Sequence, residues 1–308
     1  MSKKMTLSVS PHIHSGRSTA GVMRDVLVAL LPATVAGAVI FGARALLVLA
    51  VSLLVWVGCE ALFNLLMKKP QTVGDCSAAV TGLLLGLNLP ASIPLWQVAV
   101  GAFFAIVVVK CLFGGLGCNL VNPAITARVL MLVSFGSMAV SCMPTIVDTV
   151  AGATPLSGGA ALSLRQLFFG VYGGAIGETC ALALLVGFVY LLVRRVITWH
   201  VPVSFVGCVF VLSLFLEGFS FAGALSQVLM GGLLLGAIFM ATDYVTSPVT
   251  PLGRIVFGVG AGAITVLIRY AGSYPEGVSF AILFMNILTP YIDRLVRRRV
   301  FGKRGSAV

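Results

Sequence analysis

Long apolar stretches separated by short polar segments make up most of the chain. They lie at about residues 25–42, 44–67, 75–89, 94–113, 120–135, 172–193, 203–219, 225–242, 253–269 and 278–292. A membrane-spanning helix needs roughly 20 apolar residues, so the longer stretches predict transmembrane helices. The stretches at 75–89, 120–135 and 278–292 are short and rich in Gly, Asn, Pro or Thr. They predict half-helices or re-entrant segments that are buried in protein.

Composition and charge support a membrane protein. Of 308 residues, 59% are hydrophobic and 9% are charged, whereas soluble domains have roughly 25% charged residues. The net charge is +11, but Lys and Arg cluster at the ends of the apolar stretches. This placement is a topology signal and not a nucleic-acid-binding surface, so we expect no nucleic-acid partner.

Loop charges predict how the chain is oriented. Lys3 and Lys4 put the N-terminus in the cytoplasm, and the first 24 residues lack the apolar core of a cleaved signal peptide. Ten crossings return the most basic segments to the cytoplasm, namely Lys68-Lys69, Arg194-Arg195, Arg254 and the tail from Arg294 to Arg304. The loop at 136–171 then lies outside the cytoplasm, and we expect a multi-pass protein of the bacterial cell membrane.

Two pairs of similar segments suggest an internal repeat. Asn119–Pro123 resembles Asn286–Pro290, and Asp75 with Thr81-Gly82 resembles Asp243 with Thr246–Pro248. They predict an all-α membrane protein of two pseudo-repeats of five segments, with a site at their interface near mid-membrane. The expected division is 1–24 cytoplasmic, 25–135 first membrane repeat, 136–171 extracytoplasmic loop, 172–292 second membrane repeat and 293–308 basic cytoplasmic tail.

Acidic residues lie within or beside the apolar stretches. They are Glu60, Asp75, Glu178, Glu217 and Asp243. A charged side chain at the bilayer centre costs roughly 2.5–3.5 kcal/mol on insertion scales, so it faces a partner or water. For Asp75, Glu178 and Asp243 two interpretations stay open: an ion or proton path, or structural pairing with Arg128 and Lys110 as the obvious counter-charges.

The loop at 136–171 contains an accessible hydroxyl among small residues. Gly152 and Ala153 leave Thr154 with little steric cover, Pro155 fixes the backbone after it, and Asp148 lies six residues upstream. This pattern is typical of a site that a modifying enzyme can reach. A simple turn would also fit these residues alone.

Cysteine, histidine and glycine patterns add little chemistry. The seven cysteines include no CxxC pair, and the three histidines lie near stretch ends. Both patterns favour packing or solvated positions over metal ligation. Gly114-Gly115-Leu116-Gly117 lacks the spacing of a nucleotide-binding fingerprint and predicts a tight turn. Gly231-Gly232 and the glycines at 258, 260 and 262 favour helix packing over space for a flat ring.

Motifs along nearly the whole chain resemble a known family. They are Ser10–His12, Asp75–Gly82, Gly114–Pro123, Gly177–Thr179, Ala241–Pro248 and Tyr274–Gly277. With them the chain resembles RnfD, the membrane subunit of the Rnf ion-translocating ferredoxin:NAD oxidoreductase. It is also similar to NqrB of the sodium-pumping NADH:quinone reductase.

The resemblance implies a covalent cofactor. In that family a flavin transferase attaches FMN through its phosphate to a threonine, in the pattern Asp, two variable residues, Ser or Thr, then Gly-Ala-Thr. Asp148, Gly152, Ala153 and Thr154 match it, with Thr154 as the acceptor. Ala151 departs from the usual Ser or Thr, but that hydroxyl is not the acceptor.

The resemblance further implies a fold, ligands and partners. The fold would be related to urea and ammonium channels, and a second, noncovalent riboflavin would lie in the membrane domain. The partners would be the membrane proteins RnfA and RnfE, the flavin protein RnfG, the iron–sulfur proteins RnfB and RnfC, the flavin transferase, and Na⁺ or H⁺. The predicted function is the flavin-carrying subunit of a redox-driven ion pump. A transporter or channel without redox chemistry and a structural scaffold are the alternatives.

Overall fold

The computed structural model describes residues 18–139, 163–170, 172–272 and 276–296. The first half contains α1 (Thr19–Phe41), α2 (Ala43–Leu66), η1 (Val73–Asp75), α3 (Ser77–Leu87), α4 (Leu95–Phe104), the π-helical η2 (Ala105–Cys111), α5 (Pro123–Ser134) and η3 (Gly136–Ala139). The second half contains α6 (Leu164–Phe169), α7 (Ala181–Val193), α8 (His200–Leu216), α9 (Phe221–Leu229), α10 (Leu233–Leu235), the π-helical η5 (Gly236–Met240), α11 (Pro251–Ala271) and α12 (Val278–Leu295).

Local sequence determines where several helices begin. The side chain of Asn122 accepts hydrogen bonds from the first backbone N–H groups of α5, and Pro123 follows it. Thr250 and Pro251 start α11 in the same way. A side-chain cap satisfies N–H groups that have no partner within the helix, and proline needs none at that position. These starts are therefore encoded by two adjacent residues each.

The helices confirm a multi-pass, all-helical membrane protein in the described part of the chain. Four helices, α1, α2, α11 and α12, are long and apolar enough to span a bilayer, and α9 with α10–η5 forms a fifth segment that bends by 64°. Shorter apolar helices of 10–17 residues lie at 77–87, 95–111, 123–134, 181–193 and 200–216. Each apolar stretch expected from the sequence therefore contains helix.

Two predicted stretches differ from expectation. The stretch at 278–292, predicted as a half-helix or re-entrant segment, is part of α12, which continues to Leu295 and is long enough to span a bilayer. The other begins later than predicted. The apolar run at 172–193 is helical only from Ala181. Before it, Ile176 donates its backbone N–H to the Leu89 carbonyl (3.1 Å) and Gly177 donates to the Leu87 carbonyl (2.7 Å). Irregular backbone is tolerated at membrane depth where protein satisfies its polar groups, and the end of α3 does so here. The predicted loop at 136–171 also contains η3 and α6 at its two described ends.

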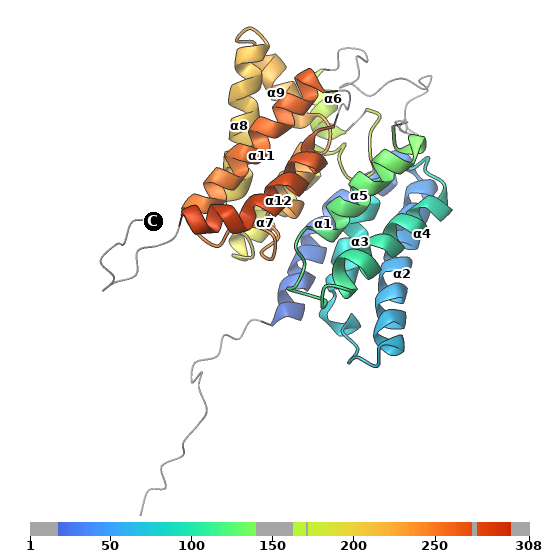
Figure 1. Cartoon of the computed structure of the whole chain (residues 1–308). Coiled ribbons are helices and arrows are strands. Elements are labelled where there is room, and N and C mark those ends of the chain that lie inside the picture. The colour runs from blue at the N-terminus through green and yellow to red at the C-terminus, as the bar shows by residue number, and fades with distance from the viewer. Residues whose placement is uncertain (1–17, 140–162, 171, 273–275, 297–308) are drawn as a thin grey trace, which may run out of the picture.

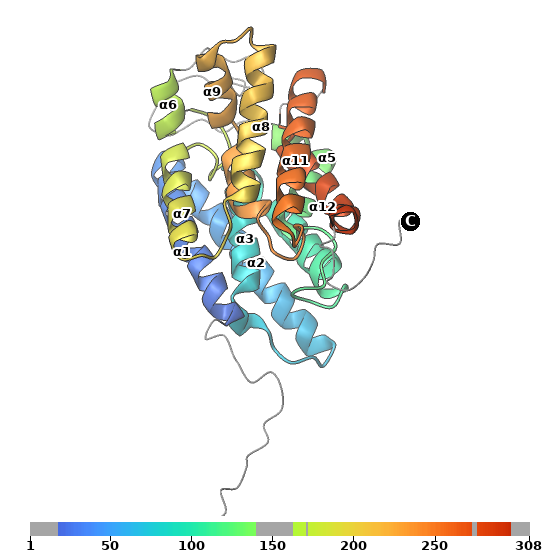
Figure 2. The same ribbon diagram turned by 90° about the vertical axis from the view of Figure 1, so that its left-hand side faces the viewer.

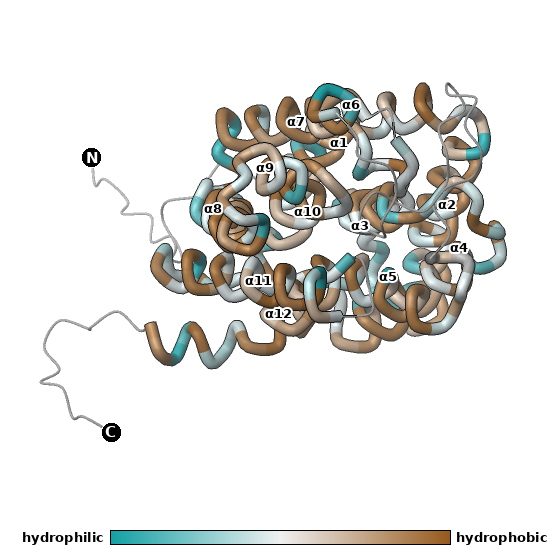
Figure 3. The backbone as a smooth tube through the Cα atoms, turned by 90° about the horizontal axis from the view of Figure 1, so that it is seen from above, coloured by the Kyte–Doolittle hydropathy of each residue, from teal (hydrophilic) through white to brown (hydrophobic). Residues whose placement is uncertain are grey.

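The two halves have corresponding contacts (Figure 1). In the first half α2 packs on α3 and α4; in the second half α8 packs on α9 and α11. Between the halves, α1 packs on α7 and α5 packs on α12. Figure 2 shows α1 beside α7. In Figure 3, α3 and α10 lie between a layer with α1 and α7 and a layer with α5 and α12.

Close backbone contact between α1 and α7 gives a first prediction. A Cβ at Gly187 of α7 would overlap the carbonyl oxygen of Ala29 on α1, whereas a Cβ at Gly58 of α2 meets nothing within 4 Å. We expect Gly187→Ala to destabilise the protein by about 1–3 kcal/mol through overpacking. Thermal unfolding in detergent measures this. Gly58→Ala is the control and should be neutral or slightly stabilising, and an unchanged midpoint for Gly187→Ala would contradict the α1–α7 contact.

Candidate functional site between the two halves

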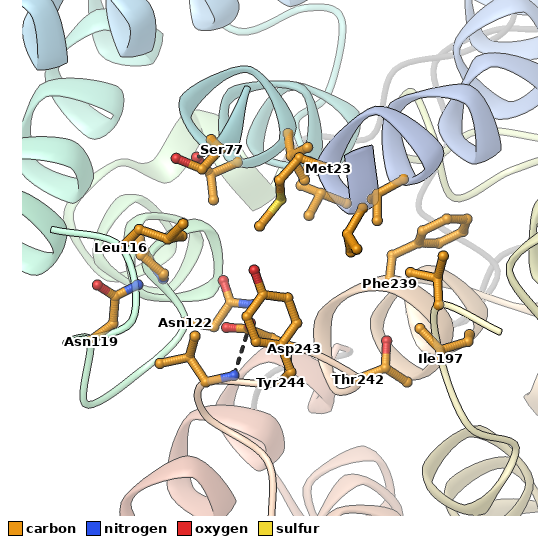
Figure 4. A pocket seen from close by; sticks show the side chains of 18 of the residues that line it. Met23, Ser77, Leu116, Asn119, Asn122, Ile197, Phe239, Thr242, Asp243 and Tyr244 are labelled. Atoms are coloured by element: carbon orange, nitrogen blue, oxygen red, sulfur yellow. Dashed lines mark hydrogen bonds between the residues drawn. The ribbon is translucent and has the colours of Figure 1, made fainter. Parts of the chain in front are cut away.

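A pocket opens between the two halves, and we call it the interface pocket. Its cavity volume is about 80 Å³, well below the roughly 300–1,000 Å³ typical of small-molecule sites. Its apolar walls come from α1, α3, α7 and η5. Its polar side chains are Ser77, Thr81, Lys110, Asn119, Asn122, Thr242, Asp243 and Tyr244. Figure 4 shows Met23 and Ser77 on one side and Thr242 and Tyr244 on the other.

Two aspartates, one from each half, make the same local hydrogen bond at or near this pocket. An Asp75 carboxylate oxygen accepts from the backbone N–H of Ser77 (2.8 Å). An Asp243 oxygen accepts from the backbone N–H of Val245 (3.3 Å), and its other oxygen accepts from the Thr246 hydroxyl (3.2 Å). Asp243 and Ser77 both line the pocket. In each case the carboxylate accepts from the backbone N–H two residues further along the chain. Aspartate often makes this local hydrogen bond.

A buried ion pair supports one wall of the pocket. The Lys110 ammonium contacts Glu60 Oε1 (2.9 Å) and the Ser77 hydroxyl (2.7 Å), and Thr72 donates to the same Glu60 oxygen (2.9 Å). The side chains of Lys110 and Glu60 are 1% and 3% exposed. Lys110 lies in the π-helical turn η2. Lys110 is a counter-charge, but its partner is Glu60 and not Asp75, Glu178 or Asp243, for which it was predicted.

Buried amides continue from the pocket into the protein. Asn122 donates its side-chain N–H to the Met240 carbonyl (3.2 Å). Asn88, at the end of α3, donates to the Met240 sulfur (3.4 Å) and to the Leu84 carbonyl (2.7 Å). Asn286 of α12, with its amide oriented to do so, accepts from the backbone N–H of Asn122 (3.2 Å). Three asparagines from α3, α5 and α12 thus form a polar layer between the halves.

A charge cluster lies beyond this layer. Arg128 of α5 forms ion pairs with Glu178 (2.5 Å) and with Glu276, and it donates a hydrogen bond to Asn88 Oδ1. We call Arg128, Glu178 and Glu276 the Arg128 cluster. Arg128 was predicted as a counter-charge for Asp75, Glu178 or Asp243, and of these three the structure pairs it with Glu178. A Cβ at Gly232 would meet Glu178 Oε1 at 2.5 Å, so this glycine leaves room for the cluster.

The structure separates the three predicted ion-path residues. Asp243 lines the interface pocket, and Asp75 bonds the backbone of Ser77, which also lines it, while Glu178 lies in the Arg128 cluster. The predicted attachment residues Asp148, Gly152, Ala153 and Thr154 lie outside the described residues. Sequence reasoning missed Glu276, because it follows a short polar segment and looked like a surface residue. It also missed the partner of Lys110, although a lysine in an apolar helix implies a nearby carboxylate.

Glycines away from the cluster agree with their predicted roles. Gly114, Gly115 and Gly117 have positive φ angles, as a tight turn requires. A Cβ at Gly258 would overlap Ser204 of α8, and a Cβ at Gly262 would meet Cys208 at 2.7 Å. These two glycines allow α8 and α11 to pack closely, as predicted.

Apolar helices around buried charged groups define a multi-pass membrane protein with a polar interface between two helical halves. The chain matches the family described as NQR2, RnfD, RnfE over residues 6–302, and it belongs to this family.

Relatives match over nearly their whole length. The chain is 43% identical to the D subunit of the Na⁺-translocating ferredoxin:NAD⁺ oxidoreductase complex of Acetobacterium woodii, covering 97% of this chain and 95% of the relative. It is 40% identical to the D subunit of the proton-translocating ferredoxin:NAD⁺ oxidoreductase complex of Clostridium ljungdahlii, covering 97% and 96%. It is 36% identical to the D subunit of the ion-translocating oxidoreductase complex of Shewanella amazonensis, covering 97% and 99%.

Proposed function

We propose that this chain is the flavin-carrying membrane subunit of a redox-driven ion pump, which couples electron transfer between ferredoxin and NAD⁺ to translocation of Na⁺ or H⁺. The similarity to the D subunits of such complexes over nearly full length carries this proposal. The two relatives are named for different ions, so the proposal specifies a monovalent cation. The test is whether the purified complex moves that cation in proteoliposomes when reduced ferredoxin and NAD⁺ are supplied.

The proposed topology has ten crossings in two pseudo-repeats. Its support is the four long helices, the bent segment and the five shorter apolar helices, together with the matching contacts of the two halves. Asp25 at the start of α1 pairs with Arg194 at the end of α7 (3.1 Å), so these ends share one face. Arg194 and Arg195 follow α7 at this face, and Arg254 bonds Thr198 in the same segment. Such basic residues favour the cytoplasmic side. The proposed relation to urea and ammonium channels rests on the resemblance and on the broken helices.

The proposed covalent cofactor is FMN on Thr154. Its support is the sequence pattern from Asp148 to Thr154. The loop joins the end of α5 to α6, and with the orientation above it lies outside the cytoplasm. A phosphoester uses the threonine hydroxyl and leaves the flavin ring free to accept and pass electrons. The protein positions the flavin and adjusts its electronic properties.

The interface pocket suits a noncovalent flavin such as riboflavin. Its apolar walls suit a flat aromatic ring system, which would have to widen the present cavity of about 80 Å³. The Asn119 side-chain oxygen is buried and has no hydrogen-bond partner among the described residues, so a ring N–H donor would satisfy it. Lys110 and Asn122 supply donors for carbonyl oxygens, and Tyr244, half exposed at this site, supplies an aromatic surface. We propose that these four side chains would hold and orient the ring.

Noncovalent flavin gives a second prediction. In a Thr154→Ala background, flavin released by denaturation should come from the interface pocket alone. Adding Asn119→Leu leaves the ring N–H without its acceptor, which costs about 1–3 kcal/mol of binding free energy. We therefore expect the affinity for the flavin to fall about tenfold, since 1.4 kcal/mol is a factor of ten. Gln71→Leu, an exposed position that bonds the Ala61 carbonyl, is the control. Equal flavin content in both variants would contradict this site.

The proposed ion path runs from the interface pocket to the Arg128 cluster. Asp243 lines its pocket end, where Asp75 bonds the backbone of Ser77, and Glu178 lies at its other end. Between these ends, Asn122 at the pocket bonds Met240, and Asn88 bonds Met240 and Arg128. Amide and carbonyl oxygens can take the place of water around a small cation. We propose this path for the transported ion.

The proposed partners are the other proteins of the complex. They are the membrane proteins RnfA and RnfE, the flavin protein RnfG and the iron–sulfur proteins RnfB and RnfC, with the flavin transferase acting during assembly. The names of the relatives, each the D subunit of a complex, support a multi-subunit assembly.

A further inference from the structure

The Arg128 cluster joins the two halves by charge. Arg128 belongs to α5 of the first half, and its two carboxylate partners belong to the second half. Glu178 lies in the irregular segment before α7, and Glu276 lies just before α12. One guanidinium is therefore shared by two carboxylates from separate segments.

A second arginine balances the cluster. Arg269 of α11 donates to the carbonyls of Gln227 (2.6 Å) and Met230 (3.2 Å), where α9 ends. The hydroxyl of Tyr172 donates to backbone carbonyls at Glu178 (3.4 Å) and Leu229 (3.3 Å). With Arg128 and Arg269 against Glu178 and Glu276, the described charges sum to zero. Of these two arginines, Arg128 forms the ion pairs with the carboxylates.

Exposure increases in one direction across the cluster. The side chains of Glu178, Arg128 and Glu276 are 1%, 6% and 26% exposed. Glu178 Oε2 is fully buried and has no hydrogen-bond donor among the described residues. A buried carboxylate that is not fully paired favours binding of a cation. Glu178 thus faces the protein interior, Glu276 faces solvent, and Arg128 lies between them.

We propose that Arg128 is a tethered counter-cation that closes the outer end of the ion path by occupying Glu178 in place of the transported monovalent cation. This inference rests on the proposed function. A cation arriving from the polar layer binds Glu178 while Arg128 keeps its pair with Glu276. When Arg128 returns to Glu178, the cation is displaced toward Glu276 and solvent. Each cycle exchanges one positive charge for another at Glu178, so the pairing of that carboxylate is preserved.

The test uses the complete complex in proteoliposomes with an imposed cation gradient and no electron donor. Arg128→Gln removes the charge that competes with the transported cation for Glu178. We therefore expect the passive flux of that cation to rise about tenfold, which corresponds to 1.4 kcal/mol. Glu178→Gln removes the binding carboxylate, so it should not raise the leak and should abolish transport driven by reduced ferredoxin. Radioactive sodium and an internal pH dye distinguish Na⁺ from H⁺.

Two further variants keep the test decisive. Glu217→Gln alters an exposed carboxylate that bonds Tyr270 and Gln227, and it should leave both fluxes unchanged. If the Arg128→Gln complex does not assemble, the double variant Arg128→Gln with Glu276→Gln is used in its place. It keeps the net charge of the cluster, and we expect the same leak.

Three results would overturn the inference. These are an assembled Arg128 variant with no added leak, a Glu178→Gln complex that leaks equally, and a Glu178→Gln complex that still pumps. The leak assay needs no redox reaction. Failure of the proposed function is therefore seen separately, as a parent complex that moves no cation when it oxidises ferredoxin.

Discussion

Thr154→Ala yields a chain without covalent flavin, and a complex containing it no longer passes electrons from ferredoxin to NAD⁺. The substitution removes the only hydroxyl that the pattern assigns as acceptor, so loss of the covalent cofactor should be complete. A denaturing gel viewed under ultraviolet light measures it, because covalent flavin stays on the band and fluoresces. The chain must be produced together with its flavin transferase.

Related variants make this result specific. Thr154→Ser keeps a hydroxyl and should keep part of the fluorescence. Ala151→Ser restores the usual residue of the pattern, and we expect flavin attachment equal to or above that of the parent. A parent chain without a fluorescent band would favour a transporter or channel without redox chemistry. An assembled Thr154→Ala complex with full electron transfer would favour a structural scaffold.

Lys110→Met should cause the largest loss of stability in the described part of the chain. It leaves the Glu60 carboxylate buried, with the Thr72 hydroxyl as its remaining donor. Breaking a buried ion pair from one side costs about 3–5 kcal/mol, because the remaining charge is uncompensated. This cost corresponds to a fall in the midpoint of thermal unfolding on the order of 10 °C. Thermal unfolding of the detergent-purified protein measures it.

A double variant separates charge from packing. Lys110→Met with Glu60→Met removes both charges, and well-packed apolar replacements of buried pairs are often neutral, so most of the lost stability should return. Lys69→Met is the control: Lys69 lies over the Phe63 ring at 5.5 Å, and an exposed contact of this kind is worth about 0.5–1 kcal/mol. If the double variant is as unstable as Lys110→Met, the ion pair does not explain the effect.

The chemistry of single residues was predictable where one residue type requires a particular partner. A lysine or arginine in an apolar helix needs a carboxylate, which identified Lys110 and Arg128 as counter-charges. The partner of each was not predictable, since Asp75, Glu178 and Asp243 were all open as partners of Arg128 and Lys110. Glu60 is 50 residues from Lys110, and Glu276 is 148 residues from Arg128. Nothing in the local pattern of either segment selects a partner at such a distance.

The sequence by itself determined the helical segments, their membrane character and the family, because long apolar runs, helix caps such as Asn122-Pro123 and short motifs are local properties. Tertiary structure alone decided that the backbone of 172–180 is held by the end of α3, that Asn88, Asn122 and Asn286 form one layer, and that Arg128 is shared by two carboxylates. These features depend on how two halves meet, and a contact between distant segments becomes visible only when the chain is folded.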